Sequence, residues 1–345
     1  MSGARRLRAA IVGFGGMGQR HYRAYSGTRC DVVAICDWEP DRVRSAVPAF
    51  PPDRIYADYR SLFAAHADLD IVSVVSNGPT HAEIAIAAME HGVPRVMLEK
   101  PVATNLEAAR AVADCASRHD TRLAVNHLRR WSVDYGRLKA LIAGGAIGRL
   151  RHIYFSCGST GLGNFVSHAF DQMRYFFDAE ATEVVGWIDR RGTPNPRGVG
   201  FWDPGGYGVV GFADGQRGFV DASEDTGVQY TFNFVGEYGR VVVDELNNTW
   251  TVRARTPETR DLPFVRYPAA TDMLPFDPSE PYDIVTLTGR ALAELAGDGP
   301  IRCTAGDGFR ALELVIAFHE SDEAGHRPVT LPLAGAAVGR NVAIG

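Results

Sequence analysis

Cysteine is scarce in this sequence, and its spacing fits no metal-binding pattern. The 345 residues include five cysteines, and no two of them stand in Cys-x-x-Cys spacing: Cys30, Cys36, Cys115, Cys157 and Cys303. An odd number without a paired spacing argues against a structural zinc site and against a disulfide framework. The expectation is therefore a protein with free thiols in a reducing cytoplasm.

The sequence also lacks long apolar runs and an excess of basic residues. No segment approaches the ~18 uninterrupted apolar residues that indicate a membrane-spanning helix. The net charge is −5 and the Lys and Arg residues are dispersed, which argues against a nucleic-acid or membrane-surface partner. What remains is an ordinary globular balance, with 46% hydrophobic and 22% charged residues. At roughly 100–200 residues per domain, the length predicts two domains.

The first third of the chain alternates short apolar strands with helices. The expected strands cover residues 7–12, 31–36, 71–75, 95–99 and 122–125. The expected helices cover residues 16–26, 81–91 and 104–118. Continuous apolar strands between helices indicate a parallel sheet that is covered on both faces. Residues 1–125 are therefore predicted to form a doubly wound α/β domain of the Rossmann type.

The pattern changes after about residue 148, where strands pair through tight turns, and the second domain is predicted to cover residues 126–345. Residues 149–157 alternate like a half-exposed strand, and 205–222 and 228–245 each read as strand–turn–strand. This indicates a second domain of the α+β kind with a largely antiparallel sheet. Helices are expected over 282–297 and 305–324, and the second is predicted to pack back toward the first domain.

The stretch IVGFGGMG contains a glycine turn. Gly13, Gly15 and Gly18 stand in G-x-G-x-x-G spacing, which alone is a weak signal. Here the pattern follows a strand and opens a helix, and Asp37 ends the second strand roughly 20 residues further on. That context predicts dinucleotide binding by the turn, whose residues are Gly13, Phe14, Gly15, Gly16, Met17 and Gly18.

Asp37 decides which dinucleotide is expected. The free N–H groups and the positive dipole end of the helix would meet the phosphates. The Asp37 carboxylate can accept hydrogen bonds from the adenosine ribose, and its charge would repel a 2′-phosphate. The next residue is Trp38 rather than an arginine. We therefore expect NAD rather than NADP.

Two further polar groups follow strands at the same edge of the predicted sheet. Ser76 and Asn77 follow strand 71–75, and Glu99 and Lys100 end the strand before Pro101. An isolated Glu-Lys-Pro is more often a solvated strand end with a surface ion pair. In a doubly wound domain, however, the ligand lies at the carboxyl ends of the strands. Lys100 is therefore a candidate for the nicotinamide end, with Glu99 pairing with it or contacting the ribose.

A helix predicted over residues 163–177 has one polar face. Its members recur at helical spacing: Asn164, His168, Asp171 and Tyr175. Such a stripe is usually a solvated face. Here it lies where a second domain must close the cofactor cleft, and histidine exchanges a proton near neutral pH. His168 is therefore a candidate acid/base.

Several stretches resemble the Gfo/Idh/MocA family, named for glucose–fructose oxidoreductase and inositol dehydrogenase. They include GFGGMGQRH, SNGPTHAEIAIAAMEHGVPRVMLEKP and ALELVIAFHESDEAGHRPVTLP, and the resemblance runs over nearly the whole chain. It implies an N-terminal Rossmann domain and a C-terminal domain with a large, open, mostly antiparallel sheet. It further implies NAD(P)-dependent chemistry at one CH–OH or carbonyl centre of a sugar, sugar nucleotide or cyclitol. Pairing through the open sheet as a homodimer or homotetramer is implied as well.

The resemblance also implies residue roles. Lys100 matches the active-site lysine of the family, and His168 matches the histidine of its Asp-x-x-x-His-x-x-Asp pattern. This sequence departs from the pattern, because it has Asn164 where the family has the first aspartate. Asparagine can bind substrate or orient His168, but it cannot act as a base. His81 matches a position expected on the cofactor side.

The Ser76-Asn77 pair is a second departure, because the family has a Thr-Pro turn there. Nicotinamide contacts at these two residues are therefore expected to differ from those of the family.

These residues give a working hypothesis for the reaction. His168 would take the hydroxyl proton, and Lys100 would stabilise the oxygen as charge develops. Asn164 and Asp171 are predicted to bind substrate.

Two residues after the fifth strand, Arg129 and Trp131, are predicted to bind substrate as well. With Arg130, Arg129 forms a cation pair that suits an anionic or phosphate-bearing substrate. The alternative is a salt-bridge cluster at the domain junction. Trp202 is a candidate to cover a sugar face, with simple packing as its alternative.

Two other functions remain open at this point. A redox-neutral NAD-dependent glycosidase would oxidise its sugar only transiently and would accumulate no NADH. A non-catalytic NAD-binding regulator would have no need of both Lys100 and His168. Substrate specificity is expected to lie in loops 158–165, 191–208 and 256–281, whose sequences do not name a substrate.

Overall fold

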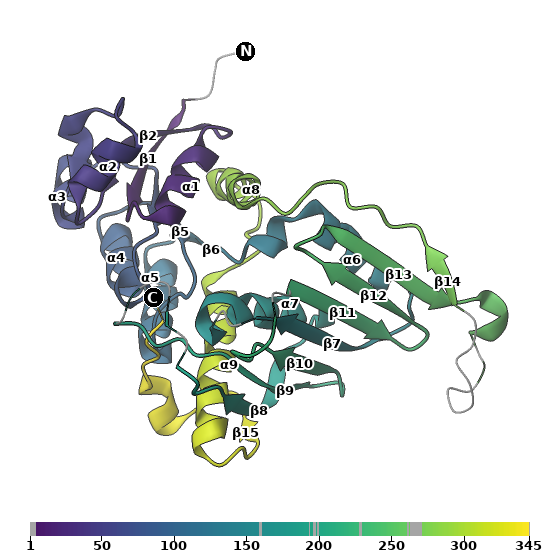
Figure 1. The fold of residues 1–345 in the computed structure, drawn as a ribbon. Helices are drawn as coiled ribbons and strands as arrows, with labels where there is room; N and C mark the ends of the chain where they lie inside the picture. The colour runs from purple at the N-terminus through teal and green to yellow at the C-terminus, as the bar shows by residue number, and fades with distance from the viewer. Residues whose placement is uncertain are drawn as a thin grey trace.

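The computed structural model of the protein contains two sheets that share a set of helices (Figure 1). It describes residues 5–158, 161–192, 194, 195, 198, 200–227, 230–260, 262 and 271–344.

The N-terminal domain is a doubly wound α/β domain, as predicted. Its six described strands are parallel and run in the order β3-β2-β1-β4-β5-β6. They are β1 Leu7–Val12, β2 Cys30–Cys36, β3 Ile55–Tyr56, β4 Ile71–Val74, β5 Arg95–Leu98 and β6 Arg122–Val125. The order reverses between β1 and β4, which creates a crevice at the carboxyl ends of these strands.

Five helices of this domain are described, and two of them were not predicted. They are α1 Gly16–Tyr25, α2 Pro40–Ala46, α3 Tyr59–Ala65, α4 Gly78–Glu90 and α5 Leu106–Arg118. Helices α2 and α3 were missed because seven residues are too few to show a helical period. The two-residue strand β3 was missed for the same reason.

The C-terminal domain is built on a mixed, mostly antiparallel sheet. Its described strands run in the order β14-β13-β12-β11-β7-β10-β9-β8-β15. Strands β7 and β10 pair in parallel, whereas the other pairs with a described register are antiparallel. The strands are β7 Leu150–Cys157, β8 Ala181–Ile188, β9 Gly206–Phe212, β10 Arg217–Asp221, β11 Tyr230–Gly236, β12 Gly239–Asp244, β13 Thr249–Arg255, β14 Thr271–Leu274 and β15 Val329–Thr330. The predicted hairpins are β9–β10 and β11–β12.

Helices cover one face of this sheet and connect it to the first domain. They are α6 Val133–Ala143, α7 Ser167–Phe177, α8 Ile284–Ala296 and α9 Ala305–Glu323. Helix α9 packs on β8 and α7 and also on α5 and β6, while α8 packs on α1 (Figure 1). Along β11 and β12, buried residues alternate with partly exposed ones. The opposite face of the sheet is therefore left open.

Two findings bear on the expectations drawn from composition. In the described part of the chain, no helix is long and apolar enough to cross a membrane. The five cysteines are buried free thiols.

Candidate active site

The glycine turn lies between the end of β1 and the first turn of α1. Gly13 has a φ of +97°, and a Cβ there would lie 2.5 Å from the carbonyl oxygen of Val75. A Cβ on Gly18 would lie 2.1 Å from the carbonyl oxygen of Gly13. Both positions therefore require glycine, one for the turn and one for the close approach of helix and strand.

Gly15 has the opposite environment. A Cβ there would meet no atom of the described residues within 4 Å and would project into open space beside the start of α1. Gly16 and Met17 form the first turn of that helix, and Phe14 is buried below it. Open space at a helix N-terminus fits the pyrophosphate of a dinucleotide. The residues present thus suit the predicted cofactor.

Asp37 lies beside the glycine turn, as the sequence predicts. Its carboxylate is buried and accepts the N–H groups of Phe14 at 2.6 Å and Glu39 at 2.9 Å. Arg42, on α2, also donates to it at 2.9 and 3.1 Å. The sequence analysis missed Arg42, and its charge offsets part of the repulsion that Asp37 would exert on a 2′-phosphate.

Lys100 bridges the two domains. It follows β5 at the carboxyl edge of the first sheet, and its Nζ donates to the backbone carbonyl oxygen of Asn164 at 2.8 Å. Asn164 lies in a π-helical turn over Leu162–Val166, and its N–H donates to Asp203 at 2.8 Å. The helix predicted over 163–177 is found as this π-helical turn, which continues directly into α7 at Ser167. The turn aims the Asn164 carbonyl at Lys100.

His168 stands one residue into α7 and contacts a second histidine. Its ring packs edge to face on that of His127, with 5.2 Å between ring centroids. The Nδ1 atoms of both rings are buried and have no partner among the described residues. Burial, together with the charges of Lys100 and Arg129, holds the pKa of His168 well below its usual value. Burial also lowers the pKa of His127 to about 4, so both rings are neutral at pH 7.

A family model matches the part of the chain that carries the glycine turn, Asp37 and Lys100. Residues 7–127 match the oxidoreductase family with an NAD-binding Rossmann fold, Gfo/Idh/MocA. The chain carries the NAD-binding domain of the Gfo/Idh/MocA family. The match confirms the predicted resemblance over this part of the chain.

Curated relatives of this chain match over part of their length. An inositol 2-dehydrogenase of Burkholderia multivorans is 40% identical over 148 residues, which cover 41% of this chain and 43% of the relative. An inositol 2-dehydrogenase of Acidothermus cellulolyticus is 32% identical over 204 residues, which cover 55% and 59%. The match thus spans about half the length of these relatives.

Solved structures extend the likeness in fold to the C-terminal sheet. An inositol dehydrogenase homolog from Azotobacter vinelandii, complexed with NADH and myo-inositol, has a TM-score of 0.80 at 18% identity, over 95% of this chain and 98% of that one. An oxidoreductase from Agrobacterium radiobacter, in complex with NAD⁺, L-tartaric acid and magnesium, has a TM-score of 0.78 at 20% identity, over 94% and 98%. At such identities the likeness shows the fold alone.

Glu99 points into the interior of the first domain. The sequence predicts a pair with Lys100 or a ribose contact, but the Glu99 carboxylate accepts hydrogen bonds from Asn126 at 2.6 Å and lies 2.9 Å from His21 Nε2. Burial raises the pKa of Glu99, but these two partners and the charge of Lys100 outweigh it and hold the pKa at about 2. Glu99 thus anchors the strand end that carries Lys100 to the interior of the first domain.

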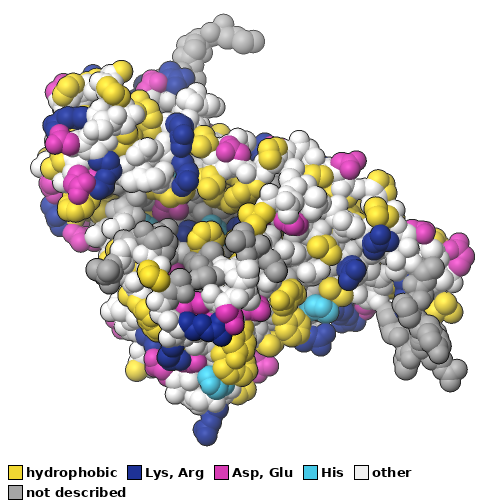
Figure 2. Space-filling model, in the orientation of Figure 1, with side chains coloured by type: hydrophobic (Ala, Val, Ile, Leu, Met, Phe, Trp, Pro, Cys, Tyr) yellow, Lys and Arg dark blue, Asp and Glu magenta, His cyan; other side chains and the backbone are white. Residues whose placement is uncertain are grey.

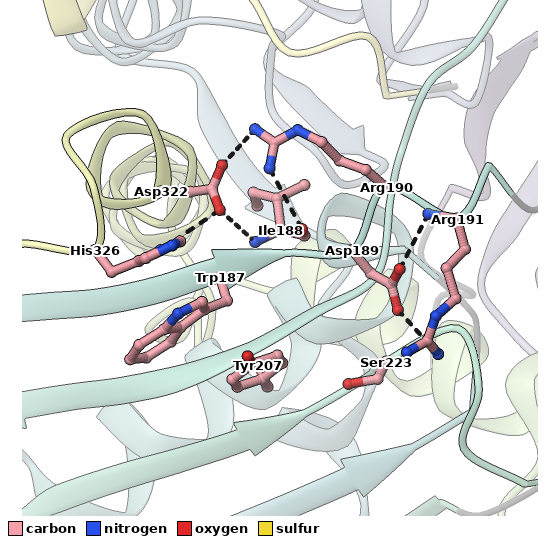
Figure 3. A pocket seen from close by; sticks show the side chains of 9 residues that line it. All are labelled: Trp187, Ile188, Asp189, Arg190, Arg191, Tyr207, Ser223, Asp322 and His326. Carbon is pink, nitrogen blue, oxygen red and sulfur yellow. Dashed lines mark hydrogen bonds and ion pairs between the residues drawn. The ribbon is translucent and has the colours of Figure 1, made fainter.

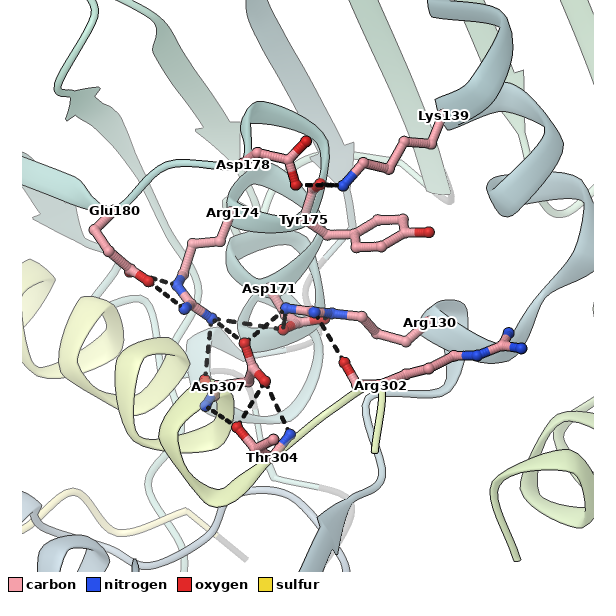
Figure 4. Close-up of polar contacts among 10 residues, drawn as sticks. All are labelled: Arg130, Lys139, Asp171, Arg174, Tyr175, Asp178, Glu180, Arg302, Thr304 and Asp307. Atoms are coloured by element: carbon pink, nitrogen blue, oxygen red, sulfur yellow. Dashed lines mark hydrogen bonds and ion pairs between the residues drawn. The ribbon is translucent and has the colours of Figure 1, made fainter. Parts of the chain in front are cut away.

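Asp171 belongs to a buried ion-pair cluster (Figure 4). It is fully buried and takes two hydrogen bonds from Arg130, at 3.0 and 2.8 Å. Arg130 also bonds Asp307 at the start of α9 at 3.0 Å, and Arg174 lies 3.2 Å from the same carboxylate. The cluster joins α7, α9 and the segment after β6.

Arg129 forms a second buried pair. Its guanidinium makes two hydrogen bonds to Glu245, at 2.7 and 2.5 Å, and the two side chains are 4% and 6% exposed. The rings of Tyr230, Phe232 and Tyr282 surround it within 6 Å. These contacts match the alternative interpretation, a salt-bridge cluster at the domain junction.

Trp131 is only 1% exposed and lies in the core. A substrate contact by Arg129, Trp131 or Asp171 therefore stays a prediction, and their surroundings favour a structural role.

Ser76, Asn77 and His81 lie together at the start of α4. The ring nitrogens of His81 lie 2.6 Å from the carbonyl oxygen of Pro101 and 2.9 Å from that of Ser76. Asn77 caps the helix through its backbone, and Thr80 donates to the Ser76 hydroxyl at 2.8 Å. His81 therefore ties the loop after β4 to the loop after Lys100.

His127 is a functional candidate that the sequence analysis missed. It belongs to the segment NHLRRW, directly after β6, in which roles were predicted only for Arg129, Arg130 and Trp131. The rule that predicted Lys100 could have found it, because β6 ends at the same edge as β5.

The loops expected to set specificity are only partly described. Within 158–165, 191–208 and 256–281, the residues outside the described set are 159, 160, 193, 196, 197, 199, 261 and 263–270. Trp202 is described and is 49% exposed, and its ring lies 5.8 Å from that of His319.

A separate pocket lies on the open face of the C-terminal sheet (Figure 3). It has a volume of about 380 Å³, and Trp187 stacks there between Tyr207 at 5.1 Å and His326 at 5.0 Å. Lys100 and His168 do not line it. Among the described residues, no cluster of His, Cys, Asp and Glu could hold a metal ion.

Proposed function

We propose that this protein is an NAD-dependent oxidoreductase that transfers hydride between nicotinamide and a secondary alcohol or ketone of a sugar, sugar nucleotide or cyclitol. The observation that carries the proposal is the contact of the Lys100 ammonium with the Asn164 turn, 2.8 Å long, with His168 in the next turn. The inositol 2-dehydrogenases among its relatives support a cyclitol or sugar substrate. Residues 1–125 would bind the cofactor, and residues 126–345 would bind substrate and form oligomers.

The chain's own residues account for the movement of the proton. A bound nicotinamide would supply the hydride acceptor in oxidation and the hydride donor in reduction. His168, neutral because burial lowers its pKa, takes the proton of the substrate hydroxyl. The Lys100 ammonium stabilises the oxygen as negative charge develops on it.

Asn164 influences the direction of the reaction. With no carboxylate at this position, nothing there raises the pKa of His168. His168 is then deprotonated well below pH 6.5, so it can act as a base in oxidation down to mildly acidic pH. Reduction needs the protonated ring, whose fraction falls as pH rises above the low pKa. The site therefore favours oxidation near neutral pH.

NAD is the proposed cofactor, with NADP used less well. Asp37 is placed to accept ribose hydroxyls, and Arg42 offsets part of its charge. Asp37→Ala should weaken the binding of NAD. It should also lower the ratio of kcat/KM for NAD to that for NADP by about tenfold, the effect of one charged hydrogen bond. Arg42→Ala should raise the same ratio. Ratios of kcat/KM for the two cofactors measure both, and an unchanged ratio in both variants would contradict the assignment.

We also propose that two or four copies pair through the open face of the C-terminal sheet. Figure 2 shows hydrophobic side chains gathered over β8, β9 and β10, and Tyr207 there is 46% exposed. An exposed aromatic patch of this kind is typical of an interface between subunits. The five buried free thiols suit the reducing cytoplasm that we propose as its compartment.

The test is NADH absorbance when the purified protein meets NAD and a panel of cyclitols, free sugars and sugar nucleotides, with NADP in parallel. A signal with NAD supports the dehydrogenase, and the responding compound identifies the substrate class. Product without NADH accumulation would indicate the glycosidase. NAD binding without any product, in both directions, would indicate the regulator.

A further inference from the structure

Residues 340–344, which we name the strap, are bonded to the first domain close to Lys100. The side-chain oxygen of Asn341 accepts hydrogen bonds from Asn105 at 2.7 Å and from Thr104 at 3.1 Å. The N–H of Val342 donates to the carbonyl oxygen of Thr104 at 2.9 Å. The strap is thus attached to the loop that leads from Lys100 into α5.

The other end of the strap packs on the turn that carries Asn164. The carbonyl oxygen of Ala343 accepts the N–H of Trp202 at 3.0 Å, beside the aspartate that holds the turn. Ile344 is 1% exposed, and it lies so close to Gly163 that a Cβ there would be 2.3 Å from its Cδ1. Its carbonyl oxygen would be 2.7 Å from a Cβ on Gly78. Ile344 is therefore enclosed by backbone from both domains.

These contacts connect Lys100 to Asn164 through the strap. From Lys100 the chain runs to Thr104, which bonds the strap, and the strap ends on Gly163, the neighbour of Asn164. The Asn164 carbonyl then accepts the Lys100 ammonium at 2.8 Å. Both attachments of the strap lie within a few residues of this pair, so they limit how far the two groups can separate.

We propose that the strap is a positioning element of the reaction centre, which holds the Asn164 turn against Lys100 by packing Ile344 on Gly163. The inference rests on the proposed function for its effect on turnover. The contact between Ile344 and Gly163 does not depend on that function. Hydrogen exchange of the amide protons in the Asn164 turn reports this contact without any substrate.

Gly163 offers a test that does not remove the strap. Its three nearest neighbours are all carbons of Ile344, and its φ lies outside the left-handed region, so alanine suits the backbone. Gly163→Ala should therefore displace Ile344 first. Ile344→Ala should loosen the same contact from the other side, and Ile344→Val should largely keep it. Val338→Ala, an apolar truncation just before the strap, is the matched control.

The first measurement is hydrogen exchange of residues 161–167 in the full chain. Ile344→Ala and Gly163→Ala should each raise exchange there by about tenfold, because a lost packing contact lowers the free energy of local opening. The double variant should show little further change, because both substitutions break one contact. Exchange should stay at the wild-type level in Val338→Ala. Unchanged exchange in both single variants would overturn the proposal.

The second measurement is turnover of the compound that gives NADH with the wild type. Ile344→Ala should lower kcat by about tenfold to a hundredfold, the effect of a ~1 Å misplacement, with NAD affinity unchanged. Ile344→Val should recover most of the loss. Faster exchange at full turnover would show that the strap does not position the centre, and would overturn the proposal.

If no compound gives NADH even with the wild type, the proposed function fails and the strap is judged separately. Acetylation of Lys100 by acetic anhydride then replaces turnover. Faster labelling in Ile344→Ala than in Val338→Ala supports the proposal, and equal labelling overturns it.

Discussion

In the first domain the polar groups of the site are bonded to the fold, whereas in the second domain several buried polar atoms have no partner. Asp37 accepts two backbone N–H groups, and His81 lies between two carbonyl oxygens. In the second domain, His168 Nδ1, Asn164 Oδ1 and both amide atoms of Gln172 are buried and unpartnered among the described residues. The first set is complete without a ligand, and the second is not.

This difference has an energetic meaning. A buried polar group without a partner costs about 1–3 kcal/mol, so natural folds avoid it away from functional sites. The polar groups beside the glycine turn are held by the fold itself. The unpartnered atoms around His168 are free to bond the hydroxyl groups of the proposed substrate.

Replacement of either proposed catalytic group should have the largest effect. Lys100→Ala and His168→Ala should each reduce kcat by about 10²–10⁴, because each removes a charge or proton acceptor at the reacting oxygen. NAD affinity should be largely kept, because the glycine turn and Asp37 are untouched. Steady-state kinetics and NAD titration measure the two quantities. Normal turnover in either variant would contradict the catalytic role proposed for that residue.

Asp171→Asn should mainly affect stability. Arg174 keeps its two hydrogen bonds to Glu180, but the buried Arg130 is left with Asp307 alone, and breaking a buried pair costs about 3–5 kcal/mol. Urea unfolding measures the loss. Arg44→Ala, which breaks an exposed pair with Asp41 (side chains 51% and 91% exposed), is the control and should cost about 0–1 kcal/mol. A raised KM at unchanged unfolding free energy would instead favour the predicted substrate contact.

The ion pairs also show what the sequence could and could not predict. The glycine turn, Asp37 and Lys100 follow from local patterns, because strand ends of a parallel sheet meet at one edge. Arg129 was predicted at that edge, but its partner Glu245 lies 116 residues away and no local pattern connects them. The position of the strap likewise depends on contacts between segments that are distant in the sequence.

Helix α7 shows the same limit for burial. Its polar stripe has the spacing of a solvated face, yet nearly every residue from Ser167 to Phe177 is buried. Packing by α9 and by the segment after β6 covers it. Periodicity identifies which residues share a face, but not what covers that face.

Asn164→Asp should move the pH dependence of oxidation. A carboxylate in the turn before His168 would raise the pKa that burial now holds low. Oxidation needs the deprotonated ring, so its rate falls as pH drops through that pKa, and the acid limb should move upward by about one pH unit or more. The pH profile of kcat/KM measures this. Asn247→Asp adds the same charge at an exposed turn and should leave the limb in place. An unmoved limb in Asn164→Asp would mean that this side chain does not act on His168.

His127→Phe should have the smallest effect on the protein. It tests directly whether an unpartnered polar atom in the second domain is kept for substrate. Phenylalanine keeps the edge-to-face contact with His168 but removes a buried Nδ1 that has no partner among the described residues. The free energy of unfolding should therefore rise by about 1 kcal/mol, the low end of the cost of an unsatisfied polar group. If the ring is kept for substrate, KM should rise in the same variant. A more stable protein with an unchanged KM would mean that His127 is not used by substrate, whereas a less stable one would mean that its nitrogen is already satisfied.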